Sequence, residues 1–238
     1  MPPPRRAPPP VPALAAALIA CAGPGADTGP GPASAAPHRC AGDADPQTIE
    51  QAVAWMAALP PPVDAPCLVA GLRRPLRVEA TTGPFSAQPA DGEASPRLFF
   101  STGGLRLSLV GSGPGAGVVE LGELVDGAHS RKAELPLPVA PGATAQDAFD
   151  QIAHPVYGTG CAVCHIDTWD DPRGGQVSIA IRPTPGTEVG IDALSALADG
   201  CAQAGAAADA RCALITEVVS GEVRPDPSPA AWPTLFEL

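Results

Sequence analysis

The sequence has little positive charge. Lys132 is its one lysine, and 14 Lys and Arg residues stand against 25 Asp and Glu residues, which gives a formal net charge of −11. Proteins that bind nucleic acids carry basic patches that contact phosphates, so this composition argues against nucleic acid as a partner. An acidic surface favours solubility and suits a basic partner protein.

The sequence also has no obvious membrane-spanning run. The apolar stretch at residues 11–20 is shorter than the ~20 residues that a transmembrane helix needs. Arg5 and Arg6 precede it, so residues 1–21 have the basic and apolar regions of a secretory signal. We therefore expect an exported chain.

The end of this stretch, Leu18-Ile19-Ala20-Cys21, resembles a bacterial lipobox. The resemblance implies cleavage before Cys21, a lipid on its thiol, and an exported chain anchored to the bacterial membrane and facing the periplasm or cell surface. The alternative is an ordinary signal peptide cleaved near Ala22 or later.

Residues 22–37 lack large apolar side chains and a balance of charges. The chain has 26 glycines and 32 prolines, and 15 of these 58 residues fall in the leader and in this segment. Such a composition is typical of a flexible tether, which would let an anchored domain stand away from the membrane.

Six of the seven cysteines remain once Cys21 is set aside. An even number of thiols in an exported chain indicates an oxidising compartment with paired cysteines. Two of the six, Cys161 and Cys164, lie three residues apart. The other four form two pairs that are close in sequence: Cys40–Cys67 and Cys201–Cys212. Other pairings remain open.

Cys161 and Cys164 are followed directly by His165. Cys-x-x-Cys-His is the spacing of a c-type haem attachment site. In a helix or tight turn the two thiols lie on one side, where each can form a thioether with a haem vinyl group while His165 reaches the iron. This motif and the short approach to it resemble those of the c-type cytochromes. The resemblance implies one covalent haem c on Cys161 and Cys164, with His165 as an axial ligand.

Three other interpretations of these residues stay open. Cys161 and Cys164 can form a redox disulfide, although thioredoxin-like proteins need a βαβ setting that is not evident nearby. They can also form a structural disulfide. With His165 they supply three ligands, whereas a closed zinc site takes four, and neighbouring residues cannot easily all point at one tetrahedral ion.

The chain lacks a methionine after Met56 and a histidine after His165. A small cytochrome c supplies a methionine downstream of its motif as second axial ligand. His154 is the first candidate for this position and His129 the next, while the spacing of Met56 in its helix favours core packing. An open iron position is the other interpretation, and it favours binding of a small ligand over simple electron transfer.

Catalytic patterns are absent too. No convergent set of carboxylates, nucleophile and base stands out, nor does a Ser–His–Asp arrangement. The glycine-rich residues 111–117 are most simply a turn between strands. We therefore expect an electron carrier or a binding protein rather than an enzyme.

The residue pattern predicts an α+β chain. Residues 38–140 are expected to hold a helix from Asp45-Pro46 to just before Pro60, followed by a small antiparallel sheet or sandwich. The strands are predicted at 67–70, 76–80, 97–102, 105–110, 117–121 and 132–137. Gly103-Gly104 is the predicted hairpin turn.

Residues 141–238 are expected to form a mostly helical, cytochrome c-like domain. Thr144 and Asp147 predict the start of a helix. Further on, a strand is predicted at 176–181, and helices at 191–203 and 208–220. The tail around Trp232 has enough apolar side chains to pack on the core.

These patterns predict an exported lipoprotein that carries one haem c, for electron transfer or haem-based ligand binding, with a redox protein as a possible partner. The alternative is a non-enzymatic surface lipoprotein stapled by three disulfides, one of them Cys161–Cys164.

Overall fold

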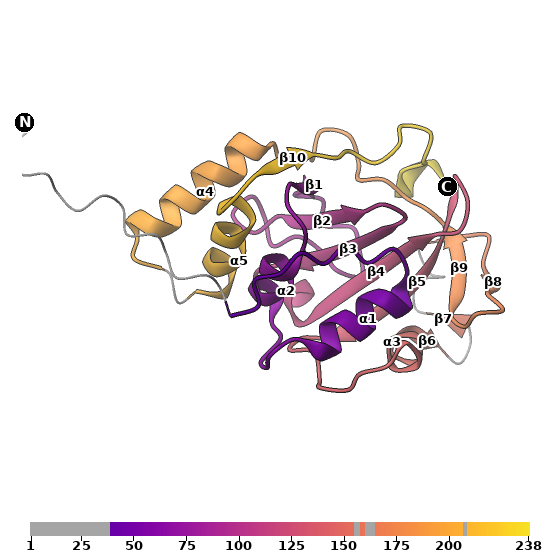
Figure 1. Ribbon diagram of the computed structural model, residues 1–238. Coiled ribbons are helices and arrows are strands. Elements are labelled where there is room, and N and C mark those ends of the chain that lie inside the picture. The colour runs from indigo at the N-terminus through magenta and orange to yellow at the C-terminus, as the bar shows by residue number, and fades with distance from the viewer. Residues whose placement is uncertain (1–38, 155–157, 160–164, 207–208) are drawn as a thin grey trace, which may run out of the picture. The chain divides into compact units, whose positions relative to one another are not determined.

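The computed structural model describes residues 39–154, 158–159, 165–206 and 209–238. The predicted signal peptide, the tether, Cys21 and the motif thiols Cys161 and Cys164 lie outside the described residues. These described residues form one compact unit, whose helices and strands are labelled in Figure 1.

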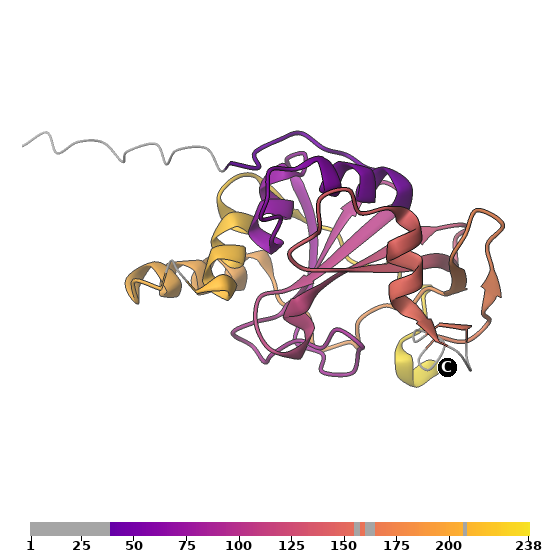
Figure 2. The same ribbon diagram turned by 90° about the horizontal axis from the view of Figure 1, so that it is seen from below.

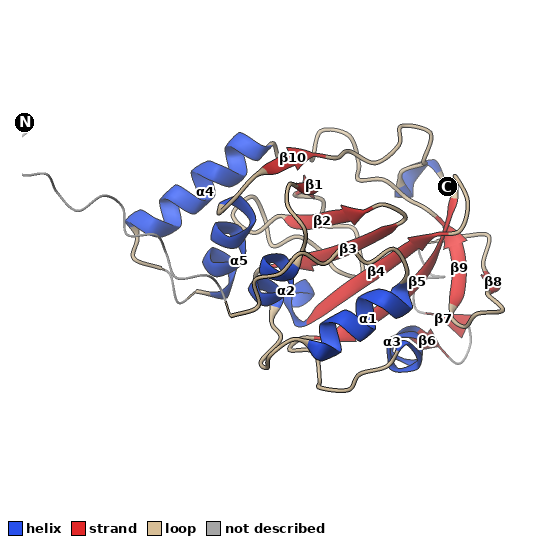
Figure 3. Cartoon of the chain, viewed as in Figure 1, coloured by secondary structure: helices blue, strands red, loops and turns tan. Residues whose placement is uncertain are grey.

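The unit is built on an eight-stranded sheet with the strand order β10-β1-β2-β3-β4-β5-β9-β8 (Figure 3). Neighbouring strands are antiparallel except β1 and β10, which are parallel. The strands are β1 (Leu76–Thr81), β2 (Arg97–Thr102), β3 (Leu105–Val110), β4 (Val118–Leu124), β5 (His129–Pro136), β8 (Trp169–Asp170), β9 (Gln176–Ile179) and β10 (Val223–Pro225). A separate ladder pairs β6 (Ala153–His154) with β7 (Gly158–Thr159).

One face of the sheet is apolar. Side chains alternate between the two faces of a strand, and Leu98, Leu107 and Leu121 are among the residues buried on this face. Helices α1 (Ile49–Ala58), α2 (Ala65–Gly71) and α3 (Ala145–Ile152) supply the other side of the core. Figure 2 shows α1 and α2 on one side of the sheet and the C-terminal turn η3 (Leu235–Glu237) on the other.

Several local predictions are confirmed. β2 and β3 meet at Gly103-Gly104, and Gly103 has a φ of +68°, in the left-handed region that favours glycine. α3 begins at a capping box between Thr144 and Asp147. Met56 packs in the core and is fully buried.

Two local predictions are wrong. Residues 67–70 belong to α2 rather than to a strand, because Asp64 accepts the backbone N–H of Cys67 at 3.0 Å as an N-cap and a proline lies in the first turn. α1 begins at Ile49, after Asp45-Pro46, because the Thr48 hydroxyl caps it instead.

The mostly helical, cytochrome c-like fold expected for residues 141–238 is also wrong. Strands β8, β9 and β10 come from this segment and join the sheet that β1–β5 form. β9 pairs with β5 from Lys132↔Gln176 to His129↔Ile179. The fold is α+β, but one sheet takes strands from both predicted halves. Pairing with β9 satisfies backbone groups of β5 that would otherwise need water.

Two further helices, α4 (Ile191–Gln203) and α5 (Ala210–Val219), pack on each other, and α5 also packs on α2. The disulfide Cys201–Cys212 joins α4 to α5. The disulfide Cys40–Cys67 ties the start of the described chain to α2. Both pairings that the sequence favoured are therefore present.

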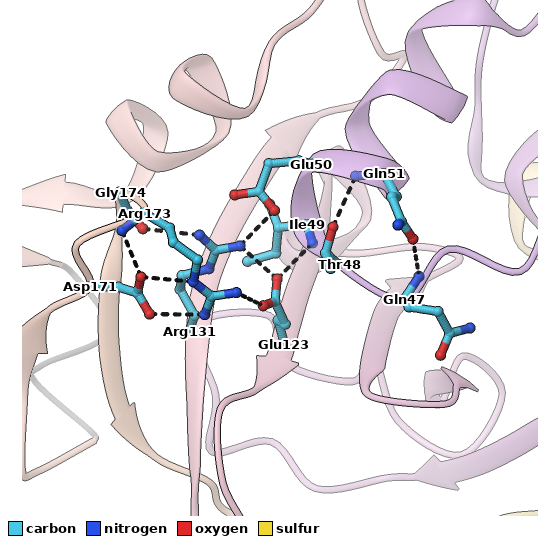
Figure 4. A network of polar contacts seen from close by, with 10 residues as sticks. All are labelled: Gln47, Thr48, Ile49, Glu50, Gln51, Glu123, Arg131, Asp171, Arg173 and Gly174. Atoms are coloured by element: carbon cyan, nitrogen blue, oxygen red, sulfur yellow. Dashed lines mark hydrogen bonds and ion pairs between the residues drawn. The ribbon is translucent and has the colours of Figure 1, made fainter.

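A buried ion cluster ties α1 and the β8–β9 hairpin to β4 and β5 (Figure 4). Oε2 of Glu123 accepts from Nη2 of Arg131 at 2.6 Å and from the Ile49 backbone N–H at 2.9 Å. Oε1 of Glu123 accepts from Arg173 at 2.6 Å. Arg131 is fully buried and also donates to Glu50 at 2.7 Å. Loss of one member leaves a buried charge without its partner, which is costly.

We predict that Glu123→Gln lowers the free energy of unfolding by about 3–5 kcal/mol, because it leaves the buried Arg131 without its closest carboxylate. Urea unfolding with the disulfides intact measures this change. Glu222→Gln is the matched control: Glu222 pairs with Arg224 at 2.6 Å, but both side chains are largely exposed, and we expect a loss of less than about 1 kcal/mol. Equal losses in the two variants would contradict the assigned role of Glu123.

Candidate functional site

The second face of the sheet is polar and forms the floor of a cavity of about 530 Å³. This volume lies in the range of ~300–1,000 Å³ typical of small-molecule sites. The floor residues alternate along β2 to β5 with the residues of the core: Arg97, Phe99, Arg106, Ser108, Glu120, Gly122, Ser130, Lys132 and Glu134.

The floor is rich in charges that are paired across strands. Arg97 lies 2.5 Å from Glu120, and Arg106 lies 2.7 Å from Glu79. The two guanidinium groups lie over the ring of Phe99, at 4.7 and 5.1 Å from its centroid. This stacking fixes both arginines.

The roof of the cavity comes from residues 83–87, residues 180–184 and the C-terminal segment. Trp232 lines the cavity, and its indole N–H donates to the carbonyl of Gly127 at 2.9 Å. Upstream of it, the backbone N–H and the hydroxyl of Ser228 donate to Glu79 at 3.0 and 2.6 Å. These bonds hold the C-terminal segment over the polar face.

Two exposed phenylalanines lie among the roof residues. Phe85 and Phe236 meet edge to face with 5.3 Å between ring centroids, and they are 67% and 64% exposed. Both line the cavity. In a chain with five phenylalanines, this gives the cavity an apolar edge open to solvent.

His165, the histidine of the predicted haem motif, borders the same cavity. Its Nδ1 lies 2.8 Å from the backbone oxygen of Ile179, at the end of β9. A carbonyl oxygen can only accept, so this contact assigns the ring proton to Nδ1. The lone pair of the neutral ring then lies on Nε2.

The environment keeps this ring neutral. Burial lowers the pKa of His165 to about 3, and the charges of Lys132 and Arg97 act in the same direction as burial. A neutral imidazole whose Nδ1–H is bound to a backbone carbonyl is a common form of a metal-ligating histidine.

The other predicted iron ligands are placed differently. His154, in β6, borders the cavity together with His165. His129 contacts Asp126 at 3.0 Å and lies edge to face with Trp169 at 4.9 Å between ring centroids. The structure thus brings His154, but not His129, to the cavity that His165 borders.

A pair of like charges lies in the cavity floor. Glu120 of β4 and Glu134 of β5 are directly opposite each other in the ladder. Burial, and after it the nearby Glu120 carboxylate, raise the pKa of Glu134. Glu120 is itself paired with Arg97.

Sequence reasoning missed the cavity floor. Ser130, Lys132 and Glu134 alternate with apolar or paired residues in β5, and such alternation usually marks a face exposed to water. The chain's one lysine, Lys132, was only a weak sign of a site, since nothing in the sequence shows that a later segment covers this face of the sheet.

Within the described ranges, no group of three or more His, Cys, Asp or Glu side chains is arranged to hold a metal ion. Cys161 and Cys164 lie outside those ranges. Likewise, no helix in the described part of the chain has the length and hydropathy needed to cross a membrane.

Comparison with known proteins gives no match: no family model, no curated protein and no solved structure is significantly similar to this chain.

The lowered pKa of His165 predicts a dependence of stability on pH in protein produced without haem. Between pH 6.5 and about 3 the unfolded chain binds the His165 proton and the folded chain does not, so the free energy of unfolding falls as the pH falls. His165 contributes up to about 2 kcal/mol of this fall between pH 7 and pH 5.

Urea unfolding at pH 7 and pH 5 tests this prediction. His165→Asn keeps an N–H donor near Ile179. We expect its free energy of unfolding to fall less than that of the wild type between pH 7 and pH 5. His129→Asn, which removes an imidazole outside the cavity, serves as the control. The same fall in the wild type and in His165→Asn would rule out a buried neutral His165.

Proposed function

We propose that this protein is an exported lipoprotein that carries one haem c, bound through Cys161 and Cys164 and ligated by His165, for electron transfer or for binding a small ligand at the iron. The observation that carries the proposal is the state of His165. Its ring is neutral, it is oriented by the carbonyl of Ile179, and its Nε2 holds the lone pair at the border of a cavity.

The donor set fits this group. A Cys-x-x-Cys-His motif needs two thiols and a neutral imidazole, and the residues of this chain supply them in order. When bound, the haem supplies an iron that exchanges one electron or takes a small ligand. The chain orients the imidazole and presents the apolar edge formed by Phe85 and Phe236.

His154 is the proposed second axial ligand, because it borders the same cavity as His165. His129 is less suitable, since its ring is held between Asp126 and Trp169. If His154 does not reach the iron, the sixth position is open to a small ligand, and ligand binding is then the favoured role.

Export and lipid anchoring remain part of the proposal. The lipobox-like end at Cys21 and the two disulfides support it, because disulfides persist in oxidising compartments outside the cytoplasm. The net charge of −11 suits a redox partner with a basic surface.

The alternative function is a non-enzymatic, disulfide-stapled surface lipoprotein in which Cys161 and Cys164 form a third disulfide. The specific observation in its favour is that both other cysteine pairs are oxidised. In that case the intact mass would rise on reduction by the hydrogens of three disulfides.

Haem attachment is tested on the mature chain produced with a c-haem maturation system. We expect a pyridine haemochrome signal and an intact mass increased by one haem, both lost in Cys161→Ala/Cys164→Ala. Cys201→Ala/Cys212→Ala is the matched control, because it removes a cysteine pair that lies outside the motif and should keep the haem. A wild-type protein without haem under these conditions would refute the proposal.

The second axial ligand is tested by absorption spectroscopy of the haem-loaded protein. His154→Ala should convert a six-coordinate low-spin spectrum into that of an iron with an open position, whereas His129→Ala should leave the spectrum unchanged. Identical spectra of His154→Ala and the wild type would show that His154 is not a ligand of the iron.

Anchoring is tested by cell fractionation. We expect the wild-type chain in the membrane fraction and Cys21→Ser in the soluble exported fraction, because the substitution removes the thiol that carries the lipid. Membrane retention of Cys21→Ser would contradict a lipid anchor on this residue.

A further inference from the structure

The chain ends in a small turn that forms part of the roof of the cavity. Residues 234–238 contain η3, and Leu235 and Phe236 line the cavity. The turn is closed on itself. The backbone N–H of Thr234 donates to the Glu237 carboxylate at 2.6 Å, and the backbone N–H of Glu237 donates to the Thr234 carbonyl at 3.0 Å. We call residues 234–238 the C-terminal flap.

The residues before the C-terminal flap are fixed to the rest of the protein. Trp232 is buried, and its indole N–H donates to the carbonyl of Gly127 at 2.9 Å. Arg182 donates from Nε to the Trp232 carbonyl at 2.7 Å and from its backbone N–H to the Pro233 carbonyl at 3.0 Å. The chain is therefore anchored up to Pro233, and the C-terminal flap can turn between Pro233 and Thr234.

Beyond this point the attachment is weak. The hydrogen bonds that the C-terminal flap makes among the described residues are all internal, and Thr234 is its one buried side chain. Phe236 meets Phe85 edge to face, and the Glu237 carboxylate lies 3.5 Å from the Arg182 guanidinium. Phe236 is 64% exposed, and the Glu237 side chain is 55% exposed. An exposed contact of either kind is worth no more than about ten-fold in an equilibrium constant.

The phenylalanine that Phe236 contacts lies on a fixed part of the roof. Phe85 is followed by Ser86, whose hydroxyl accepts a hydrogen bond from Arg97. Gln88 is fully buried and donates to the carbonyl of Val118 at 2.8 Å. Opening of the C-terminal flap therefore separates the two phenylalanine rings.

The surface behind the C-terminal flap suits an uncharged molecule. Two arginines of the floor are already paired, Arg97 with Glu120 at 2.5 Å and Arg106 with Glu79 at 2.7 Å. A charged ligand would compete with these pairs, whereas an apolar ligand gains by burial against aromatic rings. Four aromatic side chains line the cavity: Phe85, Phe99, Trp232 and Phe236.

We propose that the C-terminal flap opens and admits an uncharged apolar molecule to the cavity. The contact of Phe236 with Phe85 is one latch. The ion pair of Glu237 with Arg182 is a second latch, which salt weakens because both groups reach the solvent. Trp232 stays in place when the flap opens. The proposal does not rest on haem attachment, because it concerns entry to the cavity on the side that the flap covers.

The test uses the full exported chain with Cys21→Ser, produced without haem-maturation machinery, so that neither a lipid nor a haem interferes with the probe. The probe is N-phenyl-1-naphthylamine, an uncharged dye that fluoresces in apolar sites. Its sulfonated analogue, 1-anilinonaphthalene-8-sulfonate, has the same rings and a negative charge. Because neither dye needs iron, failure of haem attachment and failure of the flap are separate results.

We expect the uncharged dye to bind at least about ten-fold more tightly than the sulfonate, because the buried charge of the sulfonate would lack a free partner. Equal or tighter binding of the sulfonate would overturn the assigned ligand class. Absence of binding by the uncharged dye would overturn the proposal as a whole.

Stopped-flow association of the uncharged dye tests the flap itself. Phe236→Ala removes the ring of the first latch, so the flap is open for a larger fraction of the time. The association rate constant should rise by about two- to ten-fold. Leu238→Ala is the matched control and should leave the rate constant unchanged, because Leu238 is an exposed apolar residue of the same flap that does not line the cavity. Equal rate constants in the wild type and Phe236→Ala would overturn the flap.

The dependence on salt tests the second latch. The dye carries no charge, so its entry into a fixed cavity should not change between about 0.01 M and 0.15 M salt. With the flap we expect the wild-type rate constant to rise by about two- to five-fold over this range. The rise should vanish in Glu237→Gln, which keeps an acceptor for the Thr234 N–H, and persist in the exposed control Glu222→Gln. A rise that survives in Glu237→Gln would overturn the role of the ion pair.

Discussion

The described part of this protein depends on one buried guanidinium. Arg131 is fully enclosed, and the carboxylate of Glu123 that neutralises it also caps the first N–H of α1 and holds Arg173. Arg173 lies in the β8–β9 turn, so the cluster fixes that hairpin on β5. At the other end of β9, Ile179 supplies the carbonyl that orients His165. A charge cluster on one face of the sheet therefore helps to set the geometry of a histidine at the other face.

The two faces of the sheet have opposite chemistry: the same strands present aliphatic side chains on one face and polar side chains on the other. The aliphatic face is closed by α1, α2 and α3 to form the core. The polar face is closed by a C-terminal segment that is attached through hydrogen bonds to Glu79 and Gly127. A cover held by a few polar bonds leaves an enclosed space, whereas helices packed on aliphatic side chains do not. This difference explains why the cavity lies on the polar side and why its walls carry charge.

The local predictions succeeded where short-range physics decides the structure. The Gly103-Gly104 hairpin, the Thr144 capping box, the core position of Met56 and both disulfide pairs depend on neighbours within a turn or on short sequence separation. The prediction of a separate helical domain after residue 140 failed because strand pairing between β5 and β9, or between β1 and β10, joins residues 44 to 147 positions apart. No local pattern specifies such a partner.

The sequence by itself determined the motif Cys161, Cys164 and His165, the acidic charge and the alternation of polar and apolar residues along the strands. Only the tertiary structure decided that the polar side of that alternation is covered, and that His154, His165 and Lys132 border one cavity. The physical reason is that side-chain alternation follows from the backbone geometry of a single strand. The partner that covers a face is chosen by packing and hydrogen bonding between segments far apart in the chain.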